Sequence, residues 1–211
     1  MSEADPSYVR LSGHGVCVTP RPPFALHRVD VEGDGEALEV MVEIGGVESA
    51  SRVEPAAVTA ARSEAFGAVE PGAVAGAWRV EVGGVYAVPW PAGVSVVSAP
   101  EPLEPPFFLF RIAAGALVYV QGPFAPGGAP SESALAGAGQ TTVARGQRGP
   151  ARWVELAYEH DGEPWRQRHY LRPFGGGASI AVSTQAREAL APRVHEIADQ
   201  VVAAIAPYAG T

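Results

Sequence analysis

The sequence predicts an α+β protein in which antiparallel β-sheets carry packed helices and a long helix lies near the C-terminus. Short β-like segments, separated by glycine and proline, fill most of the 211 residues, which include 25 glycines and 20 prolines. One apolar stripe at helical spacing follows these segments. Two stretches about 80 residues apart also resemble each other, which predicts an internal duplication of a strand–strand–helix unit.

The composition is typical of a folded protein with a hydrophobic core. Hydrophobic residues make up 47% of the chain and charged residues 18%, and no apolar run reaches the length of a transmembrane helix. Residues 1–70 contain 12 acidic residues against five arginines, and so carry most of the net charge of -8. Because an acidic chain repels phosphate backbones, we expect no nucleic-acid partner.

The residue usage indicates what kind of genome encodes the protein, and the N-terminal sequence indicates its cellular compartment. All 15 basic residues are arginine, and lysine and asparagine, whose codons are AT-rich, are absent, which indicates a GC-rich bacterial genome. The N-terminal residues MSEADPSYVR lack the basic and apolar regions of a signal peptide, so we expect a cytoplasmic protein without membrane insertion.

The only cysteine, Cys17, excludes an internal disulfide and a multi-cysteine zinc site. It follows His14 by three residues, and on an extended segment residues three apart point to opposite faces. We therefore expect a buried strand cysteine rather than a Cys/His nucleophile pair. We expect no cofactor and no metal site, and we assign no catalytic residue.

Alternating apolar and polar residues predict twelve strands. The predicted strands span residues 16–19, 25–31, 37–44, 78–82, 85–88, 94–98, 107–112, 116–121, 141–145, 153–159, 165–172 and 178–184. Turn-forming residues predict hairpins at 33–35, 83–84 and 161–162.

Helical spacing appears in three places. The clearest stripe is Leu190, Val194, Ile197, Val201 and Ile205, with Pro192 suited to a first turn. A second helix is predicted over residues 55–66 and a short third one over 131–138, where Ser131 suits the N-cap.

On the C-terminal helix, His195 and Asp199 lie four residues apart and off the apolar stripe. We expect them to form a solvated pair on its outer face.

The duplication rests on RPPFALHRV at residues 21–29 and EPPFFLFRI at 104–112, with a similar order of elements around each. It predicts an N-terminal β-rich half over residues 1–84, a degenerate repeat of the other half, and an α+β half over 85–211. A fused pseudo-dimer of this kind predicts either a monomer or a homodimer.

From residue 86 to about 206 the order of features resembles the Mog1/PsbP-like group, with its DcrB, LpqN and secretion-effector-chaperone branches. The segments that carry the resemblance are VYAVPWPAGVSVV, ALVYVQGPF, SESALAG, RWVELAYEHDGEPWRQRHYLRPFGGGASIAVST and EALAPRVHEIADQVVAAI. The resemblance implies an antiparallel sheet with helices packed on it, and a binding or adaptor role more often than catalysis. The N-terminal half departs from the group's usual single-domain length.

The segment EHDGEPWRQRHYLRPFGGG predicts a hairpin with one face rich in arginine. Alternation places Arg166, Arg168, Tyr170 and Arg172 on one face, with Glu155 and Glu159 as expected cross-strand partners on a wet outer surface.

The opposite face of this hairpin is apolar. Val154, Leu156 and Tyr158, together with Ile180 and Val182, are the expected platform for the C-terminal helix.

The arginine face has two interpretations. It is either ordinary surface stabilisation or a docking patch for an acidic partner, with the same arginines able to bind a phosphate or a carboxylate.

An aromatic cluster gives a second candidate binding surface. Phe107, Phe108 and Phe110, with Trp90, either line a groove for a partner helix or strand, or belong to a central strand that is buried on both faces.

Three functional classes follow from these features. The first is a non-enzymatic protein-binding adaptor or chaperone, linked to a bacterial secretion or assembly system, with a protein partner. The second is a small-molecule-binding protein or an enzyme that uses His160, His169, Asp161 and the arginines. The third is a structural or assembly component, suggested by the duplication.

Overall fold

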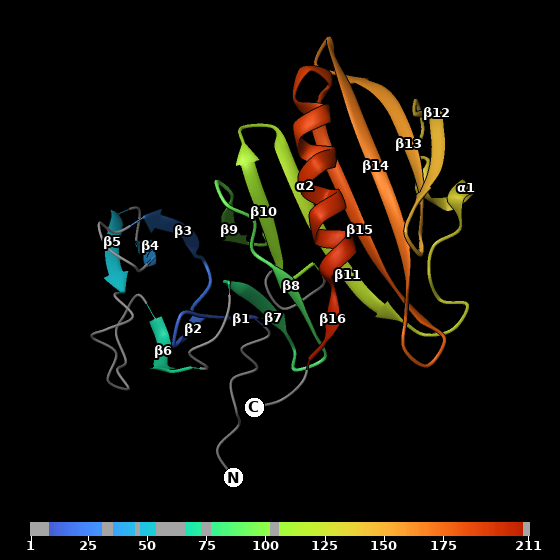
Figure 1. Cartoon of the computed structure of the whole chain (residues 1–211). Helices are drawn as coiled ribbons and strands as arrows, with labels where there is room; N and C mark the ends of the chain where they lie inside the picture. Colours follow the sequence, from blue (N-terminus) through green and yellow to red (C-terminus); the bar gives the residue numbers. More distant parts are fainter. Residues whose placement is uncertain are drawn as a thin grey trace. The chain divides into compact units, whose positions relative to one another are not determined.

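The computed structural model describes residues 9–30, 36–44, 47–53, 66–72, 77–101 and 106–208. The chain divides into two compact units, each considered by itself (Figure 1). Unit 1 comprises Met1–Phe108 with Ile205–Thr211, and unit 2 comprises Leu109–Ala204.

Unit 2 is an antiparallel sheet of strands in the order β12-β13-β14-β15-β11-β10. The strands are β10 (Phe108–Ala113), β11 (Ala116–Phe124), β12 (Thr141–Arg148), β13 (Ala151–His160), β14 (Glu163–Phe174) and β15 (Ala178–Arg187). The short turns 161–162 and 175–177 connect β13 to β14 and β14 to β15, so these strands are neighbours in both sequence and space.

Helices cover parts of both faces of the unit 2 sheet. On one face, α2 (Ala191–Ala204) packs against β11, β14 and β15 and buries the apolar stripe around Val194, Ile197 and Val201. A one-turn 3₁₀ helix, η2 (Glu188–Leu190), joins β15 to α2. On the other face lies α1 (Glu132–Leu135), which Ser131 caps by accepting a hydrogen bond from the Ala134 amide, as the sequence predicts.

The described residues of unit 1 lie mostly in strands. One sheet has the order β16-β8-β7-β1-β2-β6, and β9, β3, β4 and β5 pair in that order. The bounds are β1 (Val9–Gly13), β2 (Val16–Pro20), β3 (Ala25–Asp30), β4 (Glu36–Ile44), β5 (Val47–Val53), β6 (Phe66–Pro71), β7 (Arg79–Val82), β8 (Tyr86–Pro89), β9 (Ser95–Ser98) and β16 (Ala206–Pro207).

The core of unit 1 is built around two tryptophans. Trp78 and Trp90 are buried and meet edge to face, with ring centroids 6.1 Å apart. The Trp90 indole donates a hydrogen bond to the Val94 carbonyl at 2.7 Å. Trp78 packs so closely over Gly13 that a Cβ there would lie 2.8 Å from the Trp78 Cα atom.

The predicted fold class is wrong, because the described structure is dominated by two open antiparallel sheets with a single long helix. The short helix predicted over 131–138 ends after four residues, since Gly137 and Gly139 follow it and Gly139 adopts a positive φ of 78°. The helix predicted over 55–66 lies outside the described residues, except for Phe66, which begins β6.

All twelve predicted strands are confirmed, with ends that shift by up to a few residues. The strands β1, β5, β6 and β16 were not predicted. The turn at 161–162 is confirmed by positive φ values of 54° at Asp161 and 75° at Gly162, while the turn predicted at 33–35 lies outside the described residues.

The predicted domain boundary between residues 84 and 85 falls in the turn that joins the paired strands β7 and β8. The compact units divide at Phe108, and the predicted halves 1–84 and 85–211 stay a prediction. The internal duplication, and the monomer or homodimer that it suggests, stay predictions. Among the described residues, no helix combines the length and apolar character needed to cross a membrane.

The packing of Trp78 on Gly13 gives a test of the unit 1 core. We expect Gly13→Ala to lower the free energy of unfolding by about 1–3 kcal/mol, because the added methyl group collides with backbone that cannot turn away. Urea denaturation followed by tryptophan fluorescence measures the change. Gly175→Ala is the matched control, since its Cβ would meet nothing within 4 Å; equal effects of the two substitutions would contradict the expected overpacking.

Candidate functional site

The hairpin of β13 and β14 places two different sets of side chains on the two faces of the unit 2 sheet. Glu155 lies opposite Arg168, and Trp153 lies opposite Tyr170. One position along, Val154 lies opposite His169. Because alternate residues of a strand point to opposite faces, the first set lies under α2 and the second faces α1.

Arg168 is the centre of a network on the α2 face. Its guanidinium donates to Glu155 Oε2 at 3.1 and 2.6 Å and to the Tyr170 hydroxyl at 3.2 Å. It also lies 4.2 Å from the centre of the Trp153 ring, within the range of a cation–π contact. Burial alone would lower the pKa of Arg168, but the hydrogen bonds to Glu155 and Tyr170 outweigh it and raise the pKa above its ordinary value.

The same network ties the sheet to α2 and η2. The Tyr170 hydroxyl donates to Asp199 Oδ1 on α2 at 2.8 Å, and burial of this tyrosine raises its pKa. Arg166 donates from Nε to Glu188 Oε1 on η2 at 3.0 Å. The arginine face is therefore a helix-packing surface in which cations meet carboxylates from neighbouring elements.

This arrangement corrects the predicted wet outer surface. The pairing of Arg168 with Glu155 is confirmed, but their side chains are only 16% and 13% exposed because α2 covers them. Glu159 lies opposite Pro164 instead of an arginine.

The predicted platform for the C-terminal helix mixed residues of the two faces. Val182 lies opposite Tyr170, and Ile180 lies opposite Arg172, so both belong to the arginine face. Burial lowers the pKa of Arg172.

His195 of α2 is also buried, which corrects the solvated pair expected with Asp199. It is 7% exposed, and its Nδ1 lies 4.0 Å from Glu155 Oε2. Burial, with a further contribution from the positive charge of Arg168, lowers the pKa of His195 to about 4, so the ring is neutral near pH 7. Its Nε2 has no hydrogen-bond partner among the described residues.

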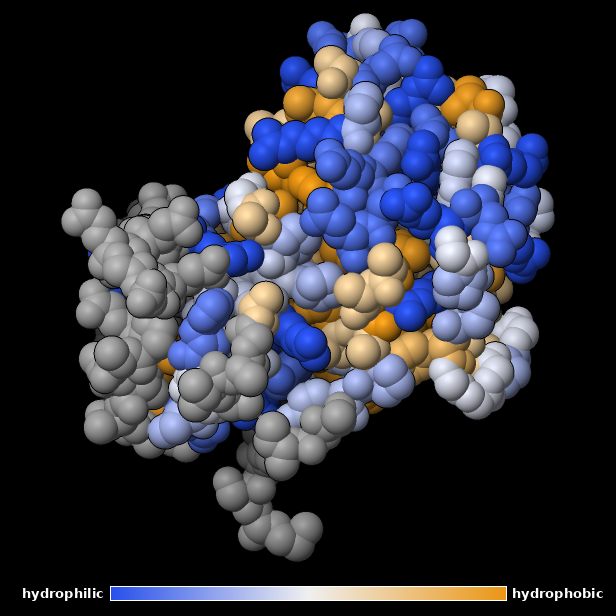
Figure 2. Space-filling view, viewed as in Figure 1, coloured by the Kyte–Doolittle hydropathy of each residue, from blue (hydrophilic) through white to orange (hydrophobic). Residues whose placement is uncertain are grey.

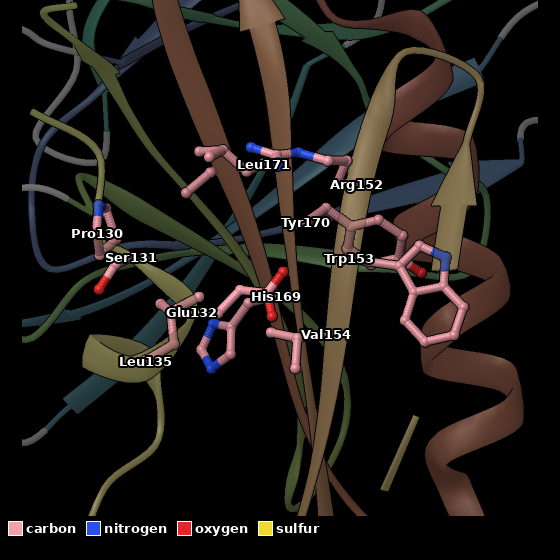
Figure 3. A pocket seen from close by; sticks show the side chains of 11 residues that line it. Pro130, Ser131, Glu132, Leu135, Arg152, Trp153, Val154, His169, Tyr170 and Leu171 are labelled. Carbon is pink, nitrogen blue, oxygen red and sulfur yellow. The ribbon is translucent and has the colours of Figure 1, made fainter. Parts of the chain in front are cut away.

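A pocket of about 270 Å³ lies between α1 and the other face of the sheet (Figure 3). The figure shows the His169 and Val154 side chains turned toward Leu135 of α1, while the Trp153 ring turns the other way. The pocket is lined by Pro130, Ser131, Glu132, Leu135, Arg152, Trp153, Val154, His169, Tyr170, Leu171 and Ala181.

His169 is the buried polar group of this pocket. Its Nδ1 shares a hydrogen bond of 2.8 Å with the Ser183 hydroxyl on β15, which fixes the ring. Its Nε2 is buried without a hydrogen-bond partner among the described residues. Burial lowers the pKa of His169 to about 4, so a neutral imidazole forms part of the pocket wall at pH 7.

The other sequence-predicted residues do not join these sites. Phe108, Phe110 and Trp90 are buried in the cores of their units, and Phe107 is half-buried. β10 is buried on one face only, since Arg111 is exposed, so neither interpretation of this strand holds in full.

His160 and Asp161 form an exposed pair at the hairpin turn, with His160 Nε2 3.6 Å from Asp161 Oδ2. His169 and Arg168 point to opposite faces and do not converge on one pocket.

The sequence marks His169 as a candidate functional residue but gives no sign of the pocket around it. Leu135, Arg152 and Val154 were not recognised as its lining. The N-cap signal at Ser131 predicted α1, but nothing in the sequence located α1 over β13 and β14.

Potential metal ligands and the single cysteine can be located in the described part of the chain. There, no group of three or more His, Cys, Asp or Glu side chains is placed to hold a metal ion. Cys17 is buried on β2, as predicted, and its sulfur accepts a hydrogen bond from Arg10 at 2.9 Å. Burial raises the pKa of Cys17, which disfavours the thiolate.

No protein-family model matches the chain, and a search of curated proteins gave no match. A solved structure that is similar to the chain is that of LpqN, a protein involved in cell envelope biogenesis of Mycobacterium tuberculosis. The two share 12% sequence identity with a TM-score of 0.41, over 59% of this chain and 83% of LpqN. This is a weak similarity of fold, and membership of the Mog1/PsbP-like group stays a prediction.

Burial of the neutral His169 imidazole makes the free energy of unfolding depend on pH. Between pH 7 and pH 4.5 the unfolded chain, with an ordinary histidine pKa of 6.5, binds a proton that folded His169, with a pKa of about 4, excludes. The free energy of unfolding therefore falls as the pH falls through this window. We expect the free energy of unfolding of His169→Leu to fall by about 2 kcal/mol less than that of the wild type over the same window.

Urea titrations at the two pH values measure this difference. Gln167→Leu, on the same face of β14 but without a titratable group, is expected to behave as the wild type does. An unchanged pH dependence in His169→Leu would show that His169 is not buried in its neutral form.

Proposed function

We propose that the chain is a non-enzymatic binding protein whose unit 2 pocket takes a compact, mostly apolar ligand with one hydrogen-bonding group. One observation carries the proposal: His169 is buried in the wall of a mostly apolar pocket with Nε2 unpartnered among the described residues. A buried polar atom without a partner costs about 1–3 kcal/mol, which a ligand that reaches it restores.

The dimensions and lining of the pocket limit the ligand. An apolar cavity of about 150 Å³ accepts one benzene molecule, so a pocket of about 270 Å³ suits a ligand of roughly ten heavy atoms. The apolar body of the ligand would lie among Pro130, Leu135, Val154 and Leu171.

The ligand's polar group is best matched by a hydroxyl. The bond between Ser183 and His169 Nδ1 is compatible with either tautomer, so Nε2 either donates or accepts. A hydroxyl group can do both.

Two other polar groups of the lining support binding more than catalysis. Ser131 caps α1, and Glu132 accepts a hydrogen bond from Arg145 at 2.9 Å. Each therefore already has a structural role. Because Nε2 is buried, a ligand reaches it only when part of the pocket wall moves. The helix α1 lines the pocket, buries none of its own residues and so resists displacement weakly.

Paired probe compounds test the proposal. We expect 4-propylphenol to bind unit 2 of the full chain about fivefold more tightly than propylbenzene, as one net hydrogen bond predicts. Amide shifts of Val154, His169 and Leu135 in NMR titrations measure both affinities. His169→Leu keeps the apolar volume and is expected to abolish the preference for the phenol.

His160→Leu is the matched control, because it removes an exposed histidine at the turn of the same hairpin. It should leave the preference intact. Equal affinity of the two compounds for the wild type, or a preference that survives His169→Leu, would contradict the proposal.

The adaptor or chaperone role is a second candidate, favoured by one observation. β12 ends the unit 2 strand order and has one neighbour, β13, among the described strands. Its eight residues are mostly exposed and include Arg145 and Arg148. An open edge of this length can pair with an extended segment of another protein, and its arginines favour acidic side chains. In this second candidate function, the protein partner is a component of a bacterial secretion or assembly system.

A designed peptide tests the adaptor role. We expect the strand-forming acidic peptide Ac-EVTVEVTV-amide to bind more tightly than Ac-KVTVKVTV-amide in fluorescence anisotropy. The double variant Arg145→Glu/Arg148→Glu should weaken binding of the acidic peptide by about threefold to tenfold, as two exposed charge contacts predict. Arg193→Glu, an exposed change on α2, is the control; equal binding of both peptides would contradict the edge-pairing mode.

A further inference from the structure

A second hollow lies on the α2 face of the unit 2 sheet, opposite to the pocket that holds His169. It is an open groove of about 620 Å³ between α2, η2 and strands β12 to β14. Hydrophilic residues dominate this side of unit 2 (Figure 2). The groove is lined by Val143, Ala144, Glu155, Arg166, Arg168, Glu188, Ala191, Pro192, His195, Glu196 and Asp199.

Negative charge exceeds positive charge in this groove. Its lining holds four carboxylates and two guanidiniums. The guanidiniums are already engaged, because Arg168 bonds Glu155 and Arg166 bonds Glu188. Two further carboxylates, those of Glu196 and Asp199, come from consecutive turns of α2.

Asp199 is only partly neutralised. Its Oδ1 accepts the Tyr170 hydroxyl, and its Oδ2 lies 3.7 Å from Nε of Arg148, whose side chain is 63% exposed. Glu196 is exposed to solvent. The groove therefore attracts a cation and repels an anion.

His195 supplies a second, independent indication of a ligand. Its side chain is 9% exposed, lines the groove, and has Nε2 unpartnered among the described residues. The Glu155 carboxylate lies 4.0 Å from Nδ1, and its negative charge favours the neutral tautomer that carries the proton on Nδ1. Nε2 is then a hydrogen-bond acceptor, and a ligand that satisfies it must be a donor.

We propose that this groove binds a primary ammonium group, which donates to His195 Nε2 and to the carboxylates of Glu196 and Asp199. An ammonium group has three donors and no acceptor, so it matches three acceptors and a negative field. Arg166 and Arg168 remain paired with their own carboxylates and form the floor of the site. The site goes beyond the proposed binding function, because it uses the other face of the sheet and a different ligand chemistry.

The ammonium group can come from a small amine or from a lysine side chain of another protein. NMR titration of the full chain with 1,5-diaminopentane and with the peptide Ac-Gly-Lys-Gly-amide separates these sources. We expect at least one of them to shift the imidazole nitrogen signals of His195, and the tighter binder identifies the source. Two neutral probes, 1,5-pentanediol and the peptide acetylated at lysine Nζ, should bind at least tenfold more weakly.

Variants of the helix locate the site. We expect Glu196→Gln to weaken amine binding by about threefold to tenfold without altering the fold, because Glu196 is exposed. Glu159→Gln removes another exposed carboxylate, from β13, and should leave the affinity unchanged. Absence of a His195 shift at 50 mM of both amines, equal binding of the neutral probes, or equal effects of the two variants would overturn the proposal.

Discussion

The packing of α2 on a charged sheet face is the constraint on which unit 2 depends. Arg168 and Glu155 are covered by the helix, so each must be satisfied by a neighbour, and the bond from Tyr170 to Asp199 joins sheet to helix within the same network. A covered charge that lost its partner would be strongly destabilising, whereas an exposed pair of the same residues contributes little. The network therefore fixes where α2 lies and, with it, the groove on the α2 face of the sheet.

The two candidate sites follow from a single alternation along β13 and β14. Residues under α2 meet other charged groups, and residues facing α1 meet apolar side chains. His169 on one face and His195 on the other are both held neutral by burial, which lowers the pKa of each to about 4. The same sheet thus presents one buried imidazole to an apolar pocket and another to an acidic groove.

The strands and turns of this fold were predictable because their signals are local. The Asp161–Gly162 turn sets the hairpin register, and the stripe through Val194 and Val201 sets the buried side of α2. The side of the sheet that receives α2 was not predictable. Alternation shows which residues share a face, and here both faces are covered, so the arginine face gave no sign that α2 would cover it. The pocket depends on the placement of α1, a long-range contact with no local signature.

The hairpin register also restricts how this sequence can change. Inserting or deleting one residue in β14 ahead of His169 would exchange the faces of every later side chain of that strand. The His169 ring would then lie beneath α2, and the Tyr170 hydroxyl would face α1. Inserting or deleting two residues would leave each later side chain on its present face of the sheet. Natural length variation in this strand should therefore occur in pairs of residues, while the turn at 175–177 can absorb single ones.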